Sequence, residues 1–181
     1  MTIAVIWQED GLLWCAADTR LVAGRDDRPT TEIAAKIYAI PVVVGALDME
    51  HEPRQPHYWT QYGFVYAGAA LPASMTAVTA STLLQKLAHP GDRTDPPRFE
   101  QIAALVHRLA KRFMEDRRRF GMEDRLRFEG DGIFSAAFFG WCPHEMKYKV
   151  AHIDGRTDAG GFRVELFYPP PPKMTATLGL C

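Results

Sequence analysis

The first seventeen residues carry the pattern that restricts the fold most. Two apolar runs rich in β-branched and aromatic residues, 2–7 and 12–17, lie on either side of the pair Asp10-Gly11. An Asp-Gly pair readily takes the positive φ that a tight connection requires, and strand-forming runs on both sides of such a pair are typical of a β-hairpin. The sequence therefore predicts an antiparallel hairpin at its start and favours an architecture built on sheets.

Thr2 follows Met1 directly, and this position gives it a particular chemistry. Threonine is small enough for an aminopeptidase to remove Met1, which would leave Thr2 with a free α-amine beside its own hydroxyl. An α-amine titrates near ~8 and can accept the hydroxyl proton, so this residue could attack an amide carbonyl. The alternative is that Met1 stays and Thr2 only begins a strand, as β-branched residues commonly do.

Three further segments supply groups that suit such a nucleophile. Asp18 follows the second apolar run, Lys36 begins another strand-like run, and Gly68 lies among small residues in Tyr66-Ala67-Gly68-Ala69-Ala70. A lysine near the hydroxyl would stabilise a developing alkoxide, and a carboxylate near the lysine would keep it charged and oriented. The backbone N–H of Gly68 could then bind an oxyanion.

In this order and spacing the residues resemble those of the N-terminal-nucleophile (Ntn) hydrolases, and within them the β-type proteasome subunits and their simpler bacterial homologues. The segment 2–24, with Ala16-Ala17-Asp18, Arg20 and a closing glycine, matches the family's opening pattern, and Lys36-Ile37-Tyr38 matches its lysine strand. By this resemblance, which covers residues 2–88, Thr2 is the nucleophile, Asp18 and Lys36 form the supporting pair, and Gly68 is the oxyanion donor. The implied fold is α+β, an αββα sandwich of two antiparallel sheets.

The resemblance also implies a substrate and an assembly. A peptide would lie extended as an added strand between residues 21–22 and 68–70, paired through main-chain hydrogen bonds. The positions expected to contact it are Leu21, Val22, Ala34, Tyr66 and Ala70. The implied protein is a threonine-type endopeptidase in a self-compartmentalising homo-oligomeric ring, which cleaves peptides or unfolded proteins, needs no cofactor or metal, and has an unfoldase as a candidate partner.

Two other functions remain open on the same residues. The chain could be a non-catalytic subunit of such an assembly, or an Ntn amidase that acts on a small molecule.

In the family a second helix pair follows, and residues from that region hold the N-terminal amine, whereas this chain ends at Cys181. The chain could accordingly be a fragment, a degenerate copy, or a compact variant closed by oligomerisation. We expect the uncovered sheet face to cause association or poor solubility.

The residue pattern of the remaining chain predicts strands, then two helices, then strands again. Residues 36–41 and 42–47 are expected to continue the meander of the first hairpin, and residues 48–62, with His51 and His57, to be a surface insertion. Pro72 is expected near the start of a helix ended by His89-Pro90, and a second helix follows. The apolar face predicted for the first helix consists of Met75, Val78, Thr79, Thr82, Leu83 and Leu87. The runs 133–141, 147–153, 162–168 and 174–178 would form a second sheet.

Composition supports a single domain over residues 1–181 and excludes several classes of function. The chain is 47% hydrophobic and 24% charged with a net charge of −1, which gives no general attraction to nucleic acid or to an anionic membrane. Basic residues between 108 and 119 alternate with acidic ones, so a solvated or subunit-contact face is favoured over nucleic-acid binding. Three separate cysteines and the lack of a signal-like or membrane-spanning run favour a cytoplasmic protein.

Overall fold

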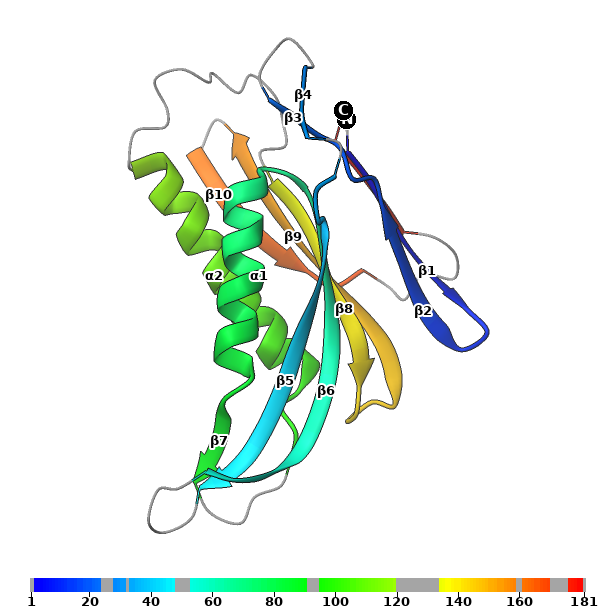
Figure 1. Cartoon of the computed structure of the whole chain (residues 1–181), viewed down its shortest axis with the longest axis vertical. Coiled ribbons are helices and arrows are strands. Elements are labelled where there is room, and N and C mark those ends of the chain that lie inside the picture. Colours follow the sequence, from blue (N-terminus) through cyan, green and yellow to red (C-terminus); the bar gives the residue numbers. More distant parts are fainter. Residues whose placement is uncertain are drawn as a thin grey trace.

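A six-stranded sheet lies between two helices on one face and a smaller three-stranded sheet on the other (Figure 1). The computed structural model describes residues 2–23, 28–31, 33–47, 53–90, 95–119, 134–158, 161–169 and 176–180. The elements are β1 (Thr2–Glu9), β2 (Leu12–Ala17), β3 (Leu21–Ala23), β4 (Arg28–Thr31), β5 (Ile37–Leu47), β6 (Pro53–Gly68), α1 (Ala70–Leu84), β7 (Leu87–Pro90), α2 (Phe99–Arg119), β8 (Phe134–Cys142), β9 (Lys147–Asp158), β10 (Gly161–Phe167) and β11 (Ala176–Leu180). The large sheet has the order β10-β9-β8-β6-β5-β7, the smaller one β11-β1-β2, and β3 pairs with β4 separately.

The N-terminal hairpin is confirmed. β1 and β2 pair antiparallel, and the two connecting residues Asp10 and Gly11 have φ values of 51° and 75°. Positive φ at both central positions is the geometry of the turn that matches the twist of paired strands. Trp7 and Trp14 face each other across the hairpin with stacked rings.

The expected surface insertion is wrong over its described part, because β6 begins at Pro53 and pairs with β5 over nearly the whole length of both strands. Residues 37–47 are likewise one strand instead of two. Pro41 is tolerated there because β7 pairs with β5 only from Val44 onward, so at Pro41 β5 has a described neighbour on one side alone. A proline cannot donate to a ladder and is therefore found where one edge of a strand is unpaired.

The strands are divided between the two sheets differently from the prediction. β8, β9 and β10 extend the sheet of β5 and β6, whereas β11 crosses to the other sheet and pairs with β1, with Thr2 opposite Leu180. The large sheet is also not purely antiparallel, because β5 and β7 run parallel. The local pattern predicts strands but not their partners, since partner choice depends on contacts distant in sequence.

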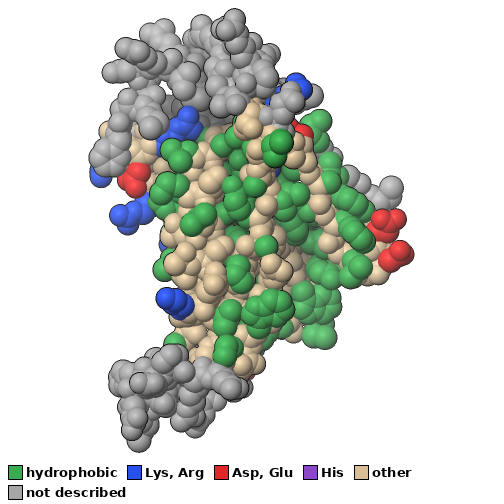
Figure 2. Space-filling model, viewed as in Figure 1, with side chains coloured by type: hydrophobic (Ala, Val, Ile, Leu, Met, Phe, Trp, Pro, Cys, Tyr) green, Lys and Arg blue, Asp and Glu red, His purple; other side chains and the backbone are tan. Residues whose placement is uncertain are grey.

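The helices pack on one face of the six-stranded sheet, but α1 presents a different side from the one predicted. Its buried residues are Pro72, Ala73, Thr76, Ala77, Ala80 and Leu84. Met75, Val78 and Leu83, which were expected to face the core, are 44%, 60% and 47% exposed. The helix also ends at Leu84, so Leu87 and His89-Pro90 belong to strand β7. Figure 2 shows hydrophobic side chains along the outward face of α1.

Two hydrophobic clusters hold the layers together. One fills the space between the helices and the six-stranded sheet and includes Phe64, Phe99 and Phe138. The other lies between the two sheets around Ala4 and Ile6. The α+β class is confirmed, with three layers in the described residues; these contain no helix over the outer face of the three-stranded sheet, so a fourth layer is not confirmed.

No helix among the described residues is long and apolar enough to span a membrane.

Candidate functional site

An ion pair between Asp18 and Lys36 lies where the N-terminal strands meet the start of β5. Lys36 Nζ is 2.8 Å from Asp18 Oδ2, and the lysine side chain is 1% exposed whereas that of Asp18 is 33% exposed. An ammonium group removed from water requires a paired anion and further acceptors. The sequence predicted these two residues as a supporting pair, and the structure brings them into contact.

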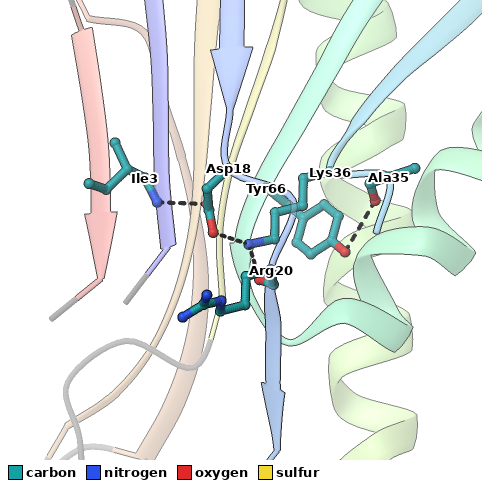
Figure 3. Close-up of polar contacts among 6 residues, drawn as sticks. All are labelled: Ile3, Asp18, Arg20, Ala35, Lys36 and Tyr66. Carbon is teal, nitrogen blue, oxygen red and sulfur yellow. Dashed lines mark hydrogen bonds and ion pairs between the residues drawn. The ribbon is translucent and has the colours of Figure 1, made fainter. Parts of the chain in front are cut away.

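Main-chain groups fix the pair at both ends (Figure 3). The amide of Ile3 donates to Asp18 Oδ1 at 3.0 Å, and the amide of Asp18 donates to the carbonyl of Ile3 at 3.1 Å. Lys36 Nζ also donates to the carbonyl of Arg20 at 2.5 Å. We call Ile3, Asp18, Arg20 and Lys36 the lysine network, and it connects Lys36 to the residue that follows Thr2.

Asp18 stays ionised because hydrogen bonds outweigh its partial burial. Burial by itself raises the pKa of this carboxyl, but the hydrogen bond and charge of Lys36 and the amide of Ile3 together hold the pKa below its ordinary value of 3.8. A carboxylate at this position therefore keeps the ammonium of Lys36 oriented at neutral pH.

Gly68 ends β6 with a φ of 91°, a conformation that favours glycine, and α1 begins two residues later. The N-cap of α1 is Ala69, which makes no side-chain capping bond, and the first turn carries no acidic residue. The first backbone N–H groups of a helix attract negative charge when no side chain caps them. The turn at Gly68 therefore lies directly before a helix N-terminus that no side chain caps.

The residues expected to contact a substrate lie in different settings. Leu21 is half-buried in β3, and Ala34 is half-buried with its amide 2.9 Å from the carbonyl of Thr19. Ala70 is half-buried at the first residue of α1. Tyr66 is only 1% exposed, and its hydroxyl donates to the carbonyl of Ala35 at 3.4 Å.

The expected nucleophile is described by its main chain alone. Thr2 begins β1, whereas its side chain, the side chain of Val22, and the whole of Met1, His51 and Cys181 lie outside the described residues. The groups that sequence reasoning missed are mostly main-chain ones, such as the Arg20 carbonyl and the Ile3 amide. Backbone groups leave no residue-specific signal, so no pattern could have indicated them.

The described residues contain no group of three His, Cys, Asp or Glu side chains that could hold a metal ion, and His57 is exposed.

Comparison with known proteins identifies the fold. No family model and no curated protein sequence matches the chain. Among solved structures, the chain is similar to a mutant form of Anbu from Hyphomicrobium sp. strain MC1, with a TM-score of 0.57 and 15% identity over 99% of this chain and 60% of that one. A second structure of Anbu from the same organism gives a TM-score of 0.54 and 15% identity over 98% of this chain and 60% of that one.

These matches correct one expectation from the sequence, namely the assignment to the β-type proteasome subunits. They show that the chain shares the fold of Anbu, and because the matching structures are of Anbu, the expected assignment to the proteasome β-type subunits is wrong. At 15% identity the likeness extends to the fold alone. The chain spans about 60% of the length of the Anbu chains that it matches.

Proposed function

We propose that the chain is an N-terminal threonine hydrolase that cleaves amide bonds in peptides or unfolded proteins as a subunit of a proteasome-like homo-oligomeric ring. The observation that carries this proposal is the lysine network. The nearly unexposed ammonium of Lys36 donates to one carboxylate oxygen of Asp18, and the amide of Ile3 donates to the other. Ile3 is the residue that follows Thr2. Further support comes from the Ntn-type fold shared with Anbu.

The mechanism follows from the chemistry of these groups. After removal of Met1, the α-amine of Thr2 accepts the proton of its own hydroxyl, and the oxygen attacks the substrate carbonyl. Lys36 stabilises the developing alkoxide, and the N–H of Gly68 donates to the oxyanion. Collapse of the intermediate breaks the C–N bond, the leaving amine takes the proton held by the α-amine of Thr2, and an ester remains on the threonine oxygen. Water then hydrolyses the ester and regenerates the free threonine.

Substrate would bind as an extended strand beside Leu21 and Val22 of β3, with residues 68–70 on its other side. β3 pairs with β4 on one edge only, among the described strands, so its other edge can accept a further strand. Ala34 and Ala70 are small and would leave room for a substrate side chain beside them.

Replacing the nucleophile tests the proposal directly. We expect Thr2→Ala to lower peptide cleavage by at least about 10³-fold, because removing a nucleophile removes the covalent route. Thr2→Ser keeps a hydroxyl and should keep measurable activity. The matched control is Thr82→Ala, which removes an exposed threonine hydroxyl from α1. Fluorogenic peptide cleavage is the readout, and the mass of the purified chain reports whether Met1 has been removed.

The alternatives give different results in the same experiment. A non-catalytic subunit would retain Met1, cleave no peptide and assemble equally well with either residue at position 2. A small-molecule amidase would lack Met1 and react at Thr2 with simple amides while leaving peptides intact. Equal peptide cleavage by the wild type and Thr2→Ala would end the nucleophile assignment.

A further inference from the structure

Three hydroxyl side chains from three elements lie close to one another near the start of β5, and we call them the hydroxyl cluster. Tyr38 comes from β5, Tyr66 from β6 and Ser74 from α1. The Tyr38 hydroxyl and Ser74 Oγ are 2.9 Å apart, and the rings of Tyr38 and Tyr66 are stacked with centroids 6.3 Å apart. The Tyr66 hydroxyl donates to the carbonyl of Ala35, next to Lys36 (Figure 3).

Each member of the hydroxyl cluster lies close in sequence to a residue of the candidate site. Tyr38 is two residues after Lys36, Tyr66 is two residues before Gly68, and Ser74 is about one helical turn after Ala70. A main-chain bond of 3.2 Å from the Tyr66 amide to the Lys36 carbonyl adds to this connection. The cluster therefore joins the segment that carries the lysine to the turn that carries the oxyanion donor.

Tyr66 has the properties of a fixed donor. Burial and, to a smaller extent, the neighbouring Tyr38 raise the pKa of its hydroxyl, Ser74 opposes this rise, and the resulting pKa is about 12. The hydroxyl stays protonated at neutral pH, so it cannot act as a base there. With 1% exposure, Tyr66 also offers almost no surface to a substrate.

We propose that the hydroxyl cluster sets the position of Lys36 relative to the Gly68–Ala70 turn, and that Tyr66 is a positioning residue instead of a wall of the substrate site. This inference rests on the proposed threonine hydrolase function. Small displacements of catalytic groups lower the rate of the chemical step far more than they weaken substrate binding. The cluster should therefore affect kcat and leave KM nearly unchanged.

Ser74→Ala and Tyr66→Phe test the proposal, because each removes one hydroxyl and keeps most of the packing. The matched control is Thr76→Val, which removes a buried hydroxyl from the same helix, one that bonds only the Pro72 carbonyl in the described structure. We expect kcat for peptide cleavage to fall about tenfold in both test variants with KM changed less than about twofold. Thr76→Val should leave both constants within about twofold.

Hydrogen exchange of single amides gives a readout that does not depend on activity. The amide of Tyr66 bonds the Lys36 carbonyl and that of Ala34 bonds the Thr19 carbonyl, so both report on the lysine segment. Both should exchange faster in Ser74→Ala than in Thr76→Val at equal global stability.

The outcomes separate this inference from the proposed function. If the wild type cleaves no peptide, the proposed function fails, and hydrogen exchange alone then decides whether the cluster holds the lysine segment. If the wild type is active, an unchanged kcat in both test variants overturns the inference. A rise of KM alone in Tyr66→Phe overturns it too, because that result would make Tyr66 a substrate contact.

Discussion

At the scale of single residues, the two side chains of the Asp18–Lys36 ion pair differ in their exposure to solvent. The lysine side chain is 1% exposed and the aspartate side chain 33% exposed, so only the carboxylate retains substantial contact with water. Removing one partner of a buried pair leaves the other charge without compensation, and the cost depends on how well water can reach it. The two single deletions should therefore have different effects on stability.

Asp18→Ala should lower the free energy of unfolding by about 3 kcal/mol, because it removes a carboxylate that pairs with a nearly unexposed ammonium. Lys36→Met should cost only about 1 kcal/mol, because the remaining carboxylate can be hydrated and the methionine fills similar space. Urea unfolding followed by circular dichroism measures both values. The interpretation is wrong if Lys36→Met proves to be the more destabilising of the two.

The pH dependence of stability should contain a component from Asp18. The folded state lowers the pKa of this carboxyl, so the unfolded chain binds its proton at a higher pH than the folded chain does. The stabilisation is complete above the unfolded pKa, near ~3.9, and is lost as the pH falls through the folded pKa. The stability difference between the wild type and Asp18→Asn should therefore shrink between about pH 5 and pH 3. Urea midpoints across this range measure it, and a constant difference would contradict the assignment.

At the scale of elements, α1 is apolar on two sides. Its 15 residues include no charged side chain, and one side packs on the sheet while Leu71, Met75, Val78 and Leu83 are 44–60% exposed. A helix of this kind offers no amphipathic pattern from which its buried side could be read. Small residues, mainly alanines, occupy the buried side because the helix packs closely against the sheet.

Substitutions on the two sides of α1 should differ sharply. Val78→Glu introduces a charge at a residue that is 60% exposed and should change stability by no more than about 0.5 kcal/mol. Ala77→Glu introduces the same charge at a residue that is 1% exposed and should cost more than about 3 kcal/mol or prevent folding. Chemical denaturation distinguishes the two. Similar losses for both variants would mean that the outward face of α1 is covered in the folded protein.

At the scale of the whole molecule, the three-stranded sheet leaves apolar side chains exposed on its outer side. Ile3, Leu12 and Trp14 are 42%, 51% and 48% exposed, although strands with one solvated face usually alternate apolar and polar residues. Contiguous exposed apolar surface of this kind promotes association. We therefore keep the prediction that this chain associates in solution.

Trp14→Glu should lower the associated fraction in sedimentation velocity, because it places a charge on this apolar face. Trp59→Glu is the matched control, since Trp59 is 67% exposed but belongs to β6 of the other sheet. A monomeric wild type would contradict the prediction, and so would an equal effect of the two substitutions.

Local patterns predicted much of the secondary structure and part of the site. The hairpin followed from Asp10-Gly11 between strand-forming runs. The second helix followed from the helical spacing of its apolar residues, and the structure places it at Phe99–Arg119. The apolar residues at this spacing are Ile102, Leu105, Val106, Leu109 and Phe113. Asp18 and Lys36 were named together because of the spacing of a family pattern, and their side chains are in contact. These features depend on φ preferences and on residue order, both of which are present in the sequence itself.

The tertiary structure alone decided which strands share a sheet, which side of α1 is buried and where Tyr66 points. Sheet partners such as β1 and β11 are more than 160 residues apart, so their pairing depends on the packing of the whole chain. An uncharged helix carries no information about its inward side, and a tyrosine in a strand can face a substrate or the core equally well. In each case the local pattern fits two arrangements, and the burial of apolar surface across the complete molecule selects one of them.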